Sequence, residues 1–249
     1  MSNDKSFDDA WAAVADVHGW MTKGQARMLY AASEATHAGD TIVEIGSFRG
    51  RSTVVLALAA PDGVDVVAIE PHAGNDRGPQ EIEGFAAEAS IDLEVFRANL
   101  DAAGVIDRVR HIRMFSDQAH GEVVGDVAVV YVDGAHRFGP ARADIRDWGR
   151  RVAPGGTLLI HDSFSSIGVT LAILRELLLG RFRYVGRSRS LAHYRADLAG
   201  GFSSRFANAG RQALQLPWFL KNLLVKVLLT LGFGKVWRML TGRTVSWPY

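Results

Sequence analysis

Short apolar runs alternate with amphipathic runs over most of this chain. The apolar, β-branched runs are typical of strands covered on both faces and predict five strands, at 41–45, 64–70, 109–115, 127–133 and 157–160. Apolar residues at helical spacing predict helices at 25–35, 52–58, 79–103, 140–152 and 168–179. We expect Thr22 to cap the first of these helices and a break near 89–92 in the third. The pattern predicts regular alternation of strand and helix.

Two further strand-like segments, at 182–185 and 191–194, flank a short basic stretch and predict a terminal antiparallel hairpin. The predicted fold class is α/β: a doubly wound, Rossmann-like, seven-stranded and mostly parallel sheet with this hairpin at its end, plus a C-terminal helical appendage. We divide the chain into an N-terminal helical cap (1–38), a central domain (39–196) and the appendage (197–249).

The appendage contains an apolar run at 216–240 that Lys221, Asn222 and Lys226 interrupt, which argues against a membrane span. On a helical wheel the leucines form one face opposite these polar residues. This face can pack against its own or a partner subunit, lie on a bilayer surface, or cover a substrate cleft. We favour subunit packing, which predicts a homo-oligomer, with peripheral membrane contact as the second choice.

Composition narrows the function classes. The 249 residues are 48% hydrophobic, carry a net charge of +1 and include no cysteine, which excludes disulfides, thiolate nucleophiles and cysteine-ligated metals. The chain lacks the start typical of a secretory signal, so we expect a cytoplasmic protein. The arginines of 137–151 recur at helical spacing, and we expect a solvated face with ion pairs to Asp144 and Asp147 rather than nucleic-acid binding.

The stretch 41–54 predicts a strand, a glycine turn and a helix start. Gly46 and Gly50 permit close backbone approach, and the helix that follows exposes unpaired N–H groups, so the stretch can cradle a nucleotide-sized ligand. Glu70 ends the next strand, twenty residues after Gly50, where an acid can accept hydrogen bonds from ribose hydroxyls. The third glycine of a dinucleotide fingerprint is missing, which favours a cofactor without a pyrophosphate.

Acids or hydroxyls follow four predicted strands, at Glu44, Glu70, Asp133 and the pair Asp162 and Ser163. One acid at a strand end is often only solvated or caps a helix, but four at the same sheet edge indicate a site. Asp133 and Asp162 offer the hard oxygen ligands that Mg²⁺ prefers. Such an ion would lower the pKa of a bound hydroxyl group.

The strings EIGSFRGRS, VDGAH and HDS, with Glu70 between them, resemble class I S-adenosylmethionine-dependent methyltransferases, among them the small O-methyltransferases that use a divalent metal. The resemblance covers 19–195. It implies that the glycine turn holds the methionine moiety, that Glu70 binds the ribose and that 115–117 border the adenine. The implied cofactor-binding residues are Glu44, Gly46, Ser47, Gly50, Ser52, Glu70, Phe115, Ser116, Asp117 and Asp133.

The branch that looks most similar methylates sugar hydroxyls, as macrocin-type and mycobacterial methylmannose polysaccharide methyltransferases do, and shares the opening G-W-M-T-x-x-Q-A at 19–26. The acceptor implied is therefore a small molecule or an oligosaccharide. His136 matches the position where catechol-type relatives carry a lysine base, and its ordinary pKa of about 6.5 suits a base near neutral pH. The alternative is an exposed loop histidine.

The sequence departs from the family pattern at Ser163, where relatives often carry Asn or Asp, so this third metal ligand is a poorer one. We expect a structural role for His161, because neighbouring side chains of a strand point to opposite faces. His72 and Asn75 are further candidates for contact with cofactor or substrate. Two rival functions stay open: a nicotinamide oxidoreductase, disfavoured by the missing glycine and by the lack of a Tyr-x-x-x-Lys pair, and a non-catalytic cofactor-binding scaffold that docks through its C-terminal helix.

Overall fold

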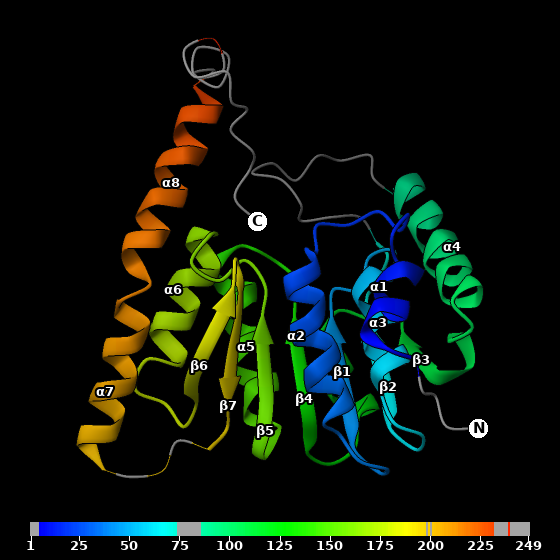
Figure 1. Ribbon diagram of the computed structural model, residues 1–249, viewed down its shortest axis with the longest axis horizontal. Coiled ribbons are helices and arrows are strands. Elements are labelled where there is room, and N and C mark those ends of the chain that lie inside the picture. The colour runs from blue at the N-terminus through cyan, green and yellow to red at the C-terminus, as the bar shows by residue number, and fades with distance from the viewer. Residues whose placement is uncertain (1–4, 74–85, 198, 200, 232–238, 240–249) are drawn as a thin grey trace.

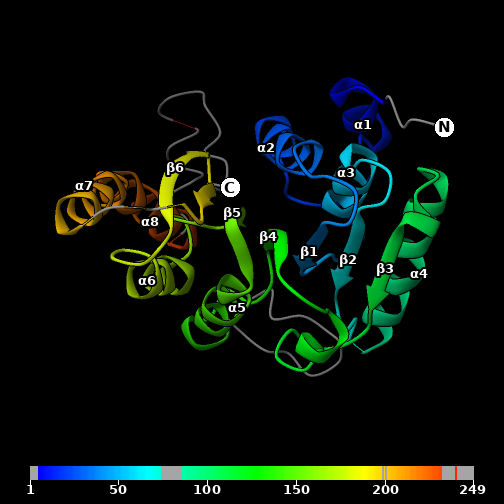
Figure 2. The same ribbon diagram turned by 90° about the horizontal axis from the view of Figure 1, so that it is seen from below.

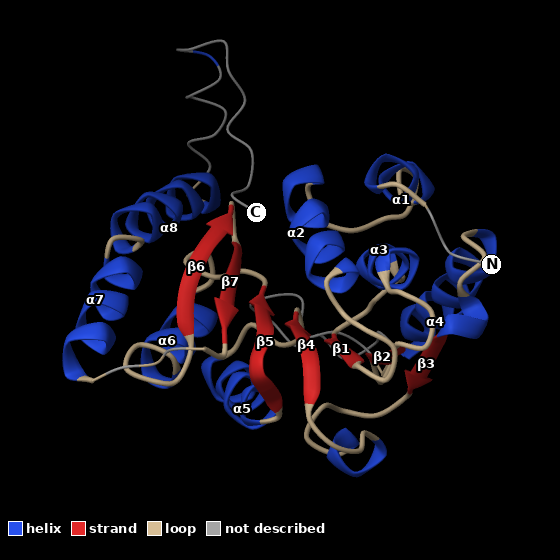
Figure 3. Ribbon diagram, turned by 60° about the horizontal axis from the view of Figure 1, so that its bottom comes forward, coloured by secondary structure: helices blue, strands red, loops and turns tan. Residues whose placement is uncertain are grey.

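The seven predicted strands form one sheet in the computed structural model, which describes residues 5–73, 86–197, 199, 201–231 and 239 (Figure 1). The strands are β1 (Thr41–Ile45), β2 (Asp65–Ile69), β3 (Val109–Ile112), β4 (Val127–Val132), β5 (Val152–Ile160), β6 (Arg183–Ser188) and β7 (Leu191–Arg195). Their order is β3-β2-β1-β4-β5-β7-β6 (Figure 3). Strands β1 to β5 pair in parallel, and β7 runs antiparallel to β5 and β6. The predicted fold class is confirmed.

Helices cover both faces of this sheet (Figure 2). One face carries α1 (Phe7–Ala13), α2 (Lys23–Glu34), α3 (Arg51–Ala59) and α4 (Ala86–Ala102); the other carries α5 (Phe138–Arg150) and α6 (Ile167–Glu176). Helices α7 (Phe202–Ala213) and α8 (Leu216–Thr230) follow each other along the β6 edge. Short 3₁₀ turns occupy Ile106–Arg108 and Ala119–Glu122.

Alternation along the strands divides the core between these two layers. Ile42 and Val129 pack with α1 to α4, whereas their neighbours Val43 and Val130 pack with α5 and α6. All four side chains are buried, which explains why the strand sequences are continuously apolar. Strand β1 lies between β2 and β4, so the chain reverses its direction of travel across the sheet there. In open α/β sheets ligands bind at that reversal.

Of the predictions for single helices and strands, some are confirmed and others are wrong. Thr22 caps α2 as predicted, in a capping box with Gln25. The break expected at 89–92 is wrong: α4 continues through it, and Asp92 is a buried anchor whose carboxylate accepts from Arg49 Nε at 2.7 Å. Strand β3 stops at Ile112, and β5 begins already at Val152, so the Pro-Gly-Gly sequence lies inside the strand. The predicted helix residues 79–85 lie outside the described residues.

Helix α8 is rotated relative to our expectation. Two of its polar residues face the body of the protein: Asn222 Nδ2 donates to the Phe164 carbonyl at 3.1 Å, and Lys226 Nζ donates to the Ser165 carbonyl at 2.8 Å. Leu220 and Leu224 are 61% and 59% exposed. Of the predicted subunit packing, packing of the leucine face against its own subunit is therefore wrong, and packing against a partner subunit stays a prediction. The reason is that buried carbonyls after β5 require donors, which only the polar side of the helix supplies.

Candidate active site

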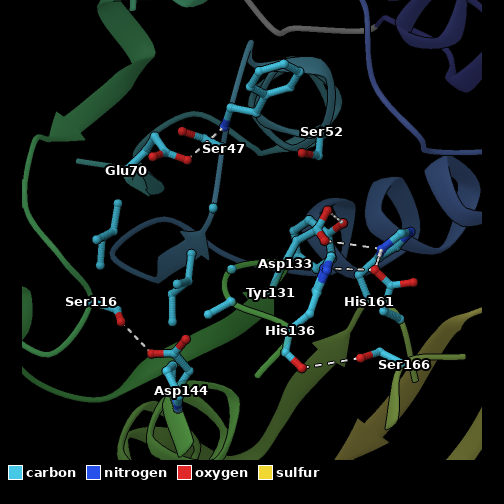
Figure 4. A pocket seen from close by; sticks show the side chains of 18 of the residues that line it. Ser47, Ser52, Glu70, Ser116, Tyr131, Asp133, His136, Asp144, His161 and Ser166 are labelled. Atoms are coloured by element: carbon cyan, nitrogen blue, oxygen red, sulfur yellow. Dashed lines mark hydrogen bonds and ion pairs between the residues drawn. The ribbon is translucent and has the colours of Figure 1, made fainter. Parts of the chain in front are cut away.

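The ends of β1, β2, β4 and β5 surround a cavity of about 990 Å³ (Figure 4). Most of the residues singled out from the sequence line it: Gly46, Ser47, Ser52, Glu70, Phe115, Ser116, Asp117, Asp133, His136 and Asp162. The volume is at the upper end of the range for small-molecule sites. The fold thus brings the glycine turn and the later strand ends to one cavity.

Gly46 sets the distance between β1 and β4. Its φ is +88°, and a Cβ atom placed there would lie 2.3 Å from the Asp133 carbonyl oxygen. Its N–H donates to the Ile69 carbonyl at 3.0 Å. Only glycine permits this conformation at this approach without strain. Gly46 therefore joins the glycine turn directly to the strand end that carries Asp133.

Two residues predicted to bind the cofactor lie outside the cavity wall. Gly50 begins α3 with a φ of +83°, and a Cβ atom there would lie 2.7 Å from Leu100 Cδ1, so it serves close packing against α4. Glu44 is fully buried and accepts hydrogen bonds from the Ser52 and Thr53 hydroxyls. Burial raises the pKa of Glu44 to about 8 against the effect of these two bonds. Through these two hydrogen bonds, Glu44 holds the start of α3 in place below the cavity.

Glu70 presents a fixed carboxylate to the cavity. It accepts from the Phe48 N–H at 3.2 Å and from the His72 N–H at 3.1 Å, one on each oxygen. Each oxygen keeps a further lone pair for a ligand hydroxyl. Nearby, the Ser47 hydroxyl oxygen is buried and has no hydrogen-bond partner among the described residues. Buried polar groups are normally paired, so this hydroxyl fits a site that a polar ligand completes.

The loop after β3 forms the opposite wall. Phe115 is 52% exposed although it lines the cavity, and the Ser116 hydroxyl donates to Asp144 of α5. Burial raises the pKa of Asp144 to about 6. The predicted ion pairing of Asp144 with arginines is wrong, because its carboxylate turns inward to Ser116. Asp147 does form its ion pair, with Arg146 Nη2 at 2.6 Å.

Asp133, His136 and Asp162 form an acidic group with one histidine, in which one ligand atom of each lies within 4.8 Å of the others. His136 Nε2 lies 2.9 Å from Asp162 Oδ2, and the Tyr131 hydroxyl donates to Asp133 Oδ2 at 2.8 Å. Burial opposes protonation of His136, but the hydrogen bond and charge of Asp162 raise its pKa above the ordinary value. Two carboxylates and an imidazole are a donor set that divalent metals accept.

The loop that carries His136 is anchored by the start of α6. The Ser166 hydroxyl donates to the His136 carbonyl at 3.3 Å, and a Cβ atom on Gly168 would lie only 2.2 Å from that carbonyl oxygen. The backbone of Asp162 also has a positive φ of 54°. Such a conformation is uncommon for residues other than glycine and often occurs at functional sites.

His161 has a larger part in the site than the sequence indicated. It is 5% exposed, lines the cavity, and its Nδ1 lies 3.2 Å from Asp133 Oδ1 and 3.4 Å from Asp162 Oδ2. Gln25 Oε1 accepts from the Thr22 N–H, so its Nε2 is the side that faces His161 Nε2 at 3.2 Å. In the neutral ring Nδ1 therefore carries the proton and lies close to both carboxylates. His161 therefore lies beside the carboxylates of Asp133 and Asp162 and holds them in position.

The prediction that Ser163 is a third metal ligand is wrong. Ser163 is fully buried, its hydroxyl donates to the Ile160 carbonyl at 2.8 Å, and it does not line the cavity. His72 is also packed behind the wall, with Nε2 2.9 Å from the Phe48 carbonyl oxygen. Asn75 lies outside the described residues.

The cavity residues that were not assigned to the site from the sequence include Trp20, Asp144 and Lys226. Trp20 stacks on Phe48 with ring centroids 5.8 Å apart. Lys226 comes from α8 at the far end of the chain, and the one signal that could have marked it is the pair of polar residues, four apart, inside an apolar helix. A buried polar side on a helix implies polar partners in the body of the protein.

Comparison with known proteins supports this picture. Residues 43–163 match the family model Methyltransf_24, described as a methyltransferase domain. The O-methyltransferase NovP is 17% identical with a TM-score of 0.60 over 74% of this chain and 84% of its own. Cofactor-bound Rv0187 from MTB is 21% identical with a TM-score of 0.54 over 76% and 88%.

A third solved structure carries its cofactor. The O-methyltransferase TomG from Streptomyces achromogenes, solved with S-adenosylmethionine (SAM) and involved in tomaymycin synthesis, is 18% identical with a TM-score of 0.50 over 77% and 88%. At these identities the likeness shows the fold, and the family match covers the strands and turns that build the cavity. The expectation of a methyltransferase is thereby confirmed: residues 43–163 match a methyltransferase domain, and the chain has the Rossmann-like methyltransferase fold.

Proposed function

We propose that this protein transfers the methyl group of SAM to a hydroxyl oxygen of a small acceptor, a sugar or an oligosaccharide. The observation that carries the proposal is the arrangement of the cavity. A cofactor side with Ser47 and Glu70 lies across from the group Asp133, His136 and Asp162 (Figure 4). Bound SAM supplies an electrophilic methyl group, and the chain has to hold it in line with the attacking oxygen.

The cofactor side fits SAM. Glu70 is held by two backbone N–H groups, and its remaining lone pairs suit the two ribose hydroxyls. Ser47 offers a buried hydroxyl that has no partner in the part of the chain that the structure describes, beside the backbone of the glycine turn. Phe115, half exposed at the wall, offers an aromatic face to the adenine. No group on this side demands a pyrophosphate, in line with the missing third glycine.

The acceptor side can generate the nucleophile. His136 is within reach of the cavity and accepts the hydroxyl proton when neutral, and its contact with Asp162 strengthens it as a base. Asp133 and Asp162 would hold a divalent cation such as Mg²⁺, which lowers the pKa of a bound hydroxyl. Trp20 at the cavity wall, 42% exposed, offers a flat face for a sugar ring.

The test is a methyl-transfer screen with SAM over mono- and oligosaccharides, with Mg²⁺ and with EDTA. We expect His136→Ala to lower turnover by about 10²-fold or more, the usual contribution of a positioned base, while calorimetry shows nearly unchanged SAM binding. His37→Ala is the matched control, because His37 lies on the surface after α2. Full activity of His136→Ala at neutral pH contradicts the base assignment. If EDTA leaves turnover unchanged, the metal assignment is wrong.

The two rival functions give different results. Binding of NADH without binding of SAM in the same calorimetry indicates an oxidoreductase. A scaffold keeps its biological activity when Asp133 and Asp162 are both replaced by alanine, whereas a methyltransferase of the proposed type loses it.

A further inference from the structure

The outward side of α7 and α8 is an apolar stripe, which we define by Phe202, Phe206, Leu220, Leu224 and Leu231. Each of these side chains is between 59% and 76% exposed. Leu220, Leu224, Val227 and Leu231 follow one another at spacings of four and three, so they share one side of the helix. An extended exposed apolar surface of this kind marks an interaction site.

The orientation of the stripe is fixed by the contacts of the opposite side. Asn208 Oδ1 accepts from the Tyr184 N–H at 2.8 Å and its Nδ2 donates to the Phe182 carbonyl at 3.0 Å. Gln212, Asn222 and Lys226 donate in the same way to carbonyls of the body. Turning the leucines inward would leave these buried groups unpaired, so no part of the chain that the structure describes covers the stripe.

The charge of the C-terminal segment indicates which kind of surface binds the apolar stripe. Residues 198–249 contain seven Lys or Arg residues and no Asp or Glu. The first 197 residues contain 21 basic and 27 acidic residues, so the net charge of +1 divides into −6 and +7. Lys221, exposed next to Leu220, places one of these cations at the edge of the stripe. An apolar helix side with cations and no acids beside it complements an anionic lipid surface.

We propose that α7 and α8 dock in the plane of an anionic membrane surface, with the apolar stripe in the headgroup and acyl boundary. The segment Phe202–Thr230 is long and apolar enough to cross a membrane by length and composition, and 6% of its apolar 18-residue window is buried in the protein. A spanning position would carry Asn208, Asn222 and Lys226 into hydrocarbon and break their contacts, whereas an in-plane position keeps them. A symmetric contact with a second copy would bring two segments of charge +7 together.

The test uses the full chain and vesicles, without acceptor or SAM. We expect flotation with vesicles of equal parts phosphatidylglycerol and phosphatidylcholine, weaker binding to phosphatidylcholine alone, and a loss of this difference at high salt. Leu220→Ser/Leu224→Ser should lower the partition coefficient by roughly tenfold or more. The matched control is Ile91→Ser/Val124→Ser, which changes two exposed apolar residues elsewhere and should bind like the parent chain. Circular dichroism and SAM calorimetry check that both variants fold.

Absence of vesicle binding by the parent chain overturns the proposal, as does equal binding by both double variants. If light scattering shows a dimer that Leu220→Ser/Leu224→Ser converts to a monomer, and vesicles do not bind, the stripe belongs to a second copy of the chain. The vesicle assay involves no methyl transfer, so its failure leaves the proposed enzymatic function untouched.

Discussion

Replacing Gly46 by alanine tests whether the glycine turn and the acid group are joined by one backbone contact. Two costs are expected. The φ of +88° costs a side chain about 1–2 kcal/mol. The new Cβ atom would also lie 2.3 Å from the Asp133 carbonyl oxygen and 2.9 Å from Gly134 Cα. Both are backbone atoms that cannot rotate away, so overpacking adds roughly 1–3 kcal/mol.

Gly39→Ala separates the two costs, because Gly39 has a similar φ of +91° and open space around the position of its Cβ. The gain from a stiffer unfolded chain is the same in both variants. Urea unfolding should show Gly46→Ala less stable than Gly39→Ala by about 2 kcal/mol, and calorimetry should show weaker SAM binding for Gly46→Ala alone. Equal stability and equal SAM affinity of the two variants would refute the contact and its role in the site.

Two further predictions concern burial. Burial raises the pKa of Asp144 from 3.8 to about 6, so on raising the pH the unfolded chain loses this proton before the folded chain does. The free energy of unfolding should therefore fall as the pH rises from about 4 to 6, by about 3 kcal/mol in total. Asp144→Asn keeps an acceptor for Ser116 and should flatten that part of the urea-midpoint profile; an unchanged slope contradicts it. Asn222→Leu should cost about 1–3 kcal/mol by leaving the Phe164 carbonyl unpaired, while Lys221→Leu changes stability little; the reverse order indicates a rotated α8.

The strands themselves and the position of the site could be predicted because both depend on local patterns. Continuous apolar runs fix the buried strands, and each of four strands ends in a polar residue, so parallel pairing places these residues at one edge. Glu70, Asp133 and Asp162 line the same cavity for this reason. The roles of Glu44 and Ser163 could not be predicted, because they depend on which neighbours a buried oxygen finds. Glu44 accepts hydrogen bonds from two hydroxyls of α3, and Ser163 donates to the carbonyl of Ile160 at the end of β5.

Contacts between distant segments account for the other differences. Gln25, from the N-terminal helix, holds His161 behind the acids, and Lys226, from the C-terminal helix, reaches the same cavity. The contact of Gln25 leaves no periodic signal in the sequence, and that of Lys226 leaves only the spacing of Asn222 and Lys226 within the apolar helix. Helix α8 shows the limit most clearly: its leucine side is the natural candidate for burial, yet unpaired carbonyls after β5 select the polar side. Leaving these buried carbonyls without hydrogen bonds would cost more free energy than leaving the apolar side of α8 exposed.

One consequence of the Gly46 contact concerns the proposed chemistry. The backbone that would carry the methyl donor touches the backbone that carries Asp133, so the two halves of the cavity cannot move independently at this point. His161 extends the connection, because its Nδ1 faces both Asp133 and Asp162. In-line transfer requires the attacking oxygen, the methyl carbon and the leaving sulfur to be held within a few tenths of an ångström. The short path from Gly46 through Asp133 and His161 to Asp162 supplies that rigidity from the chain itself.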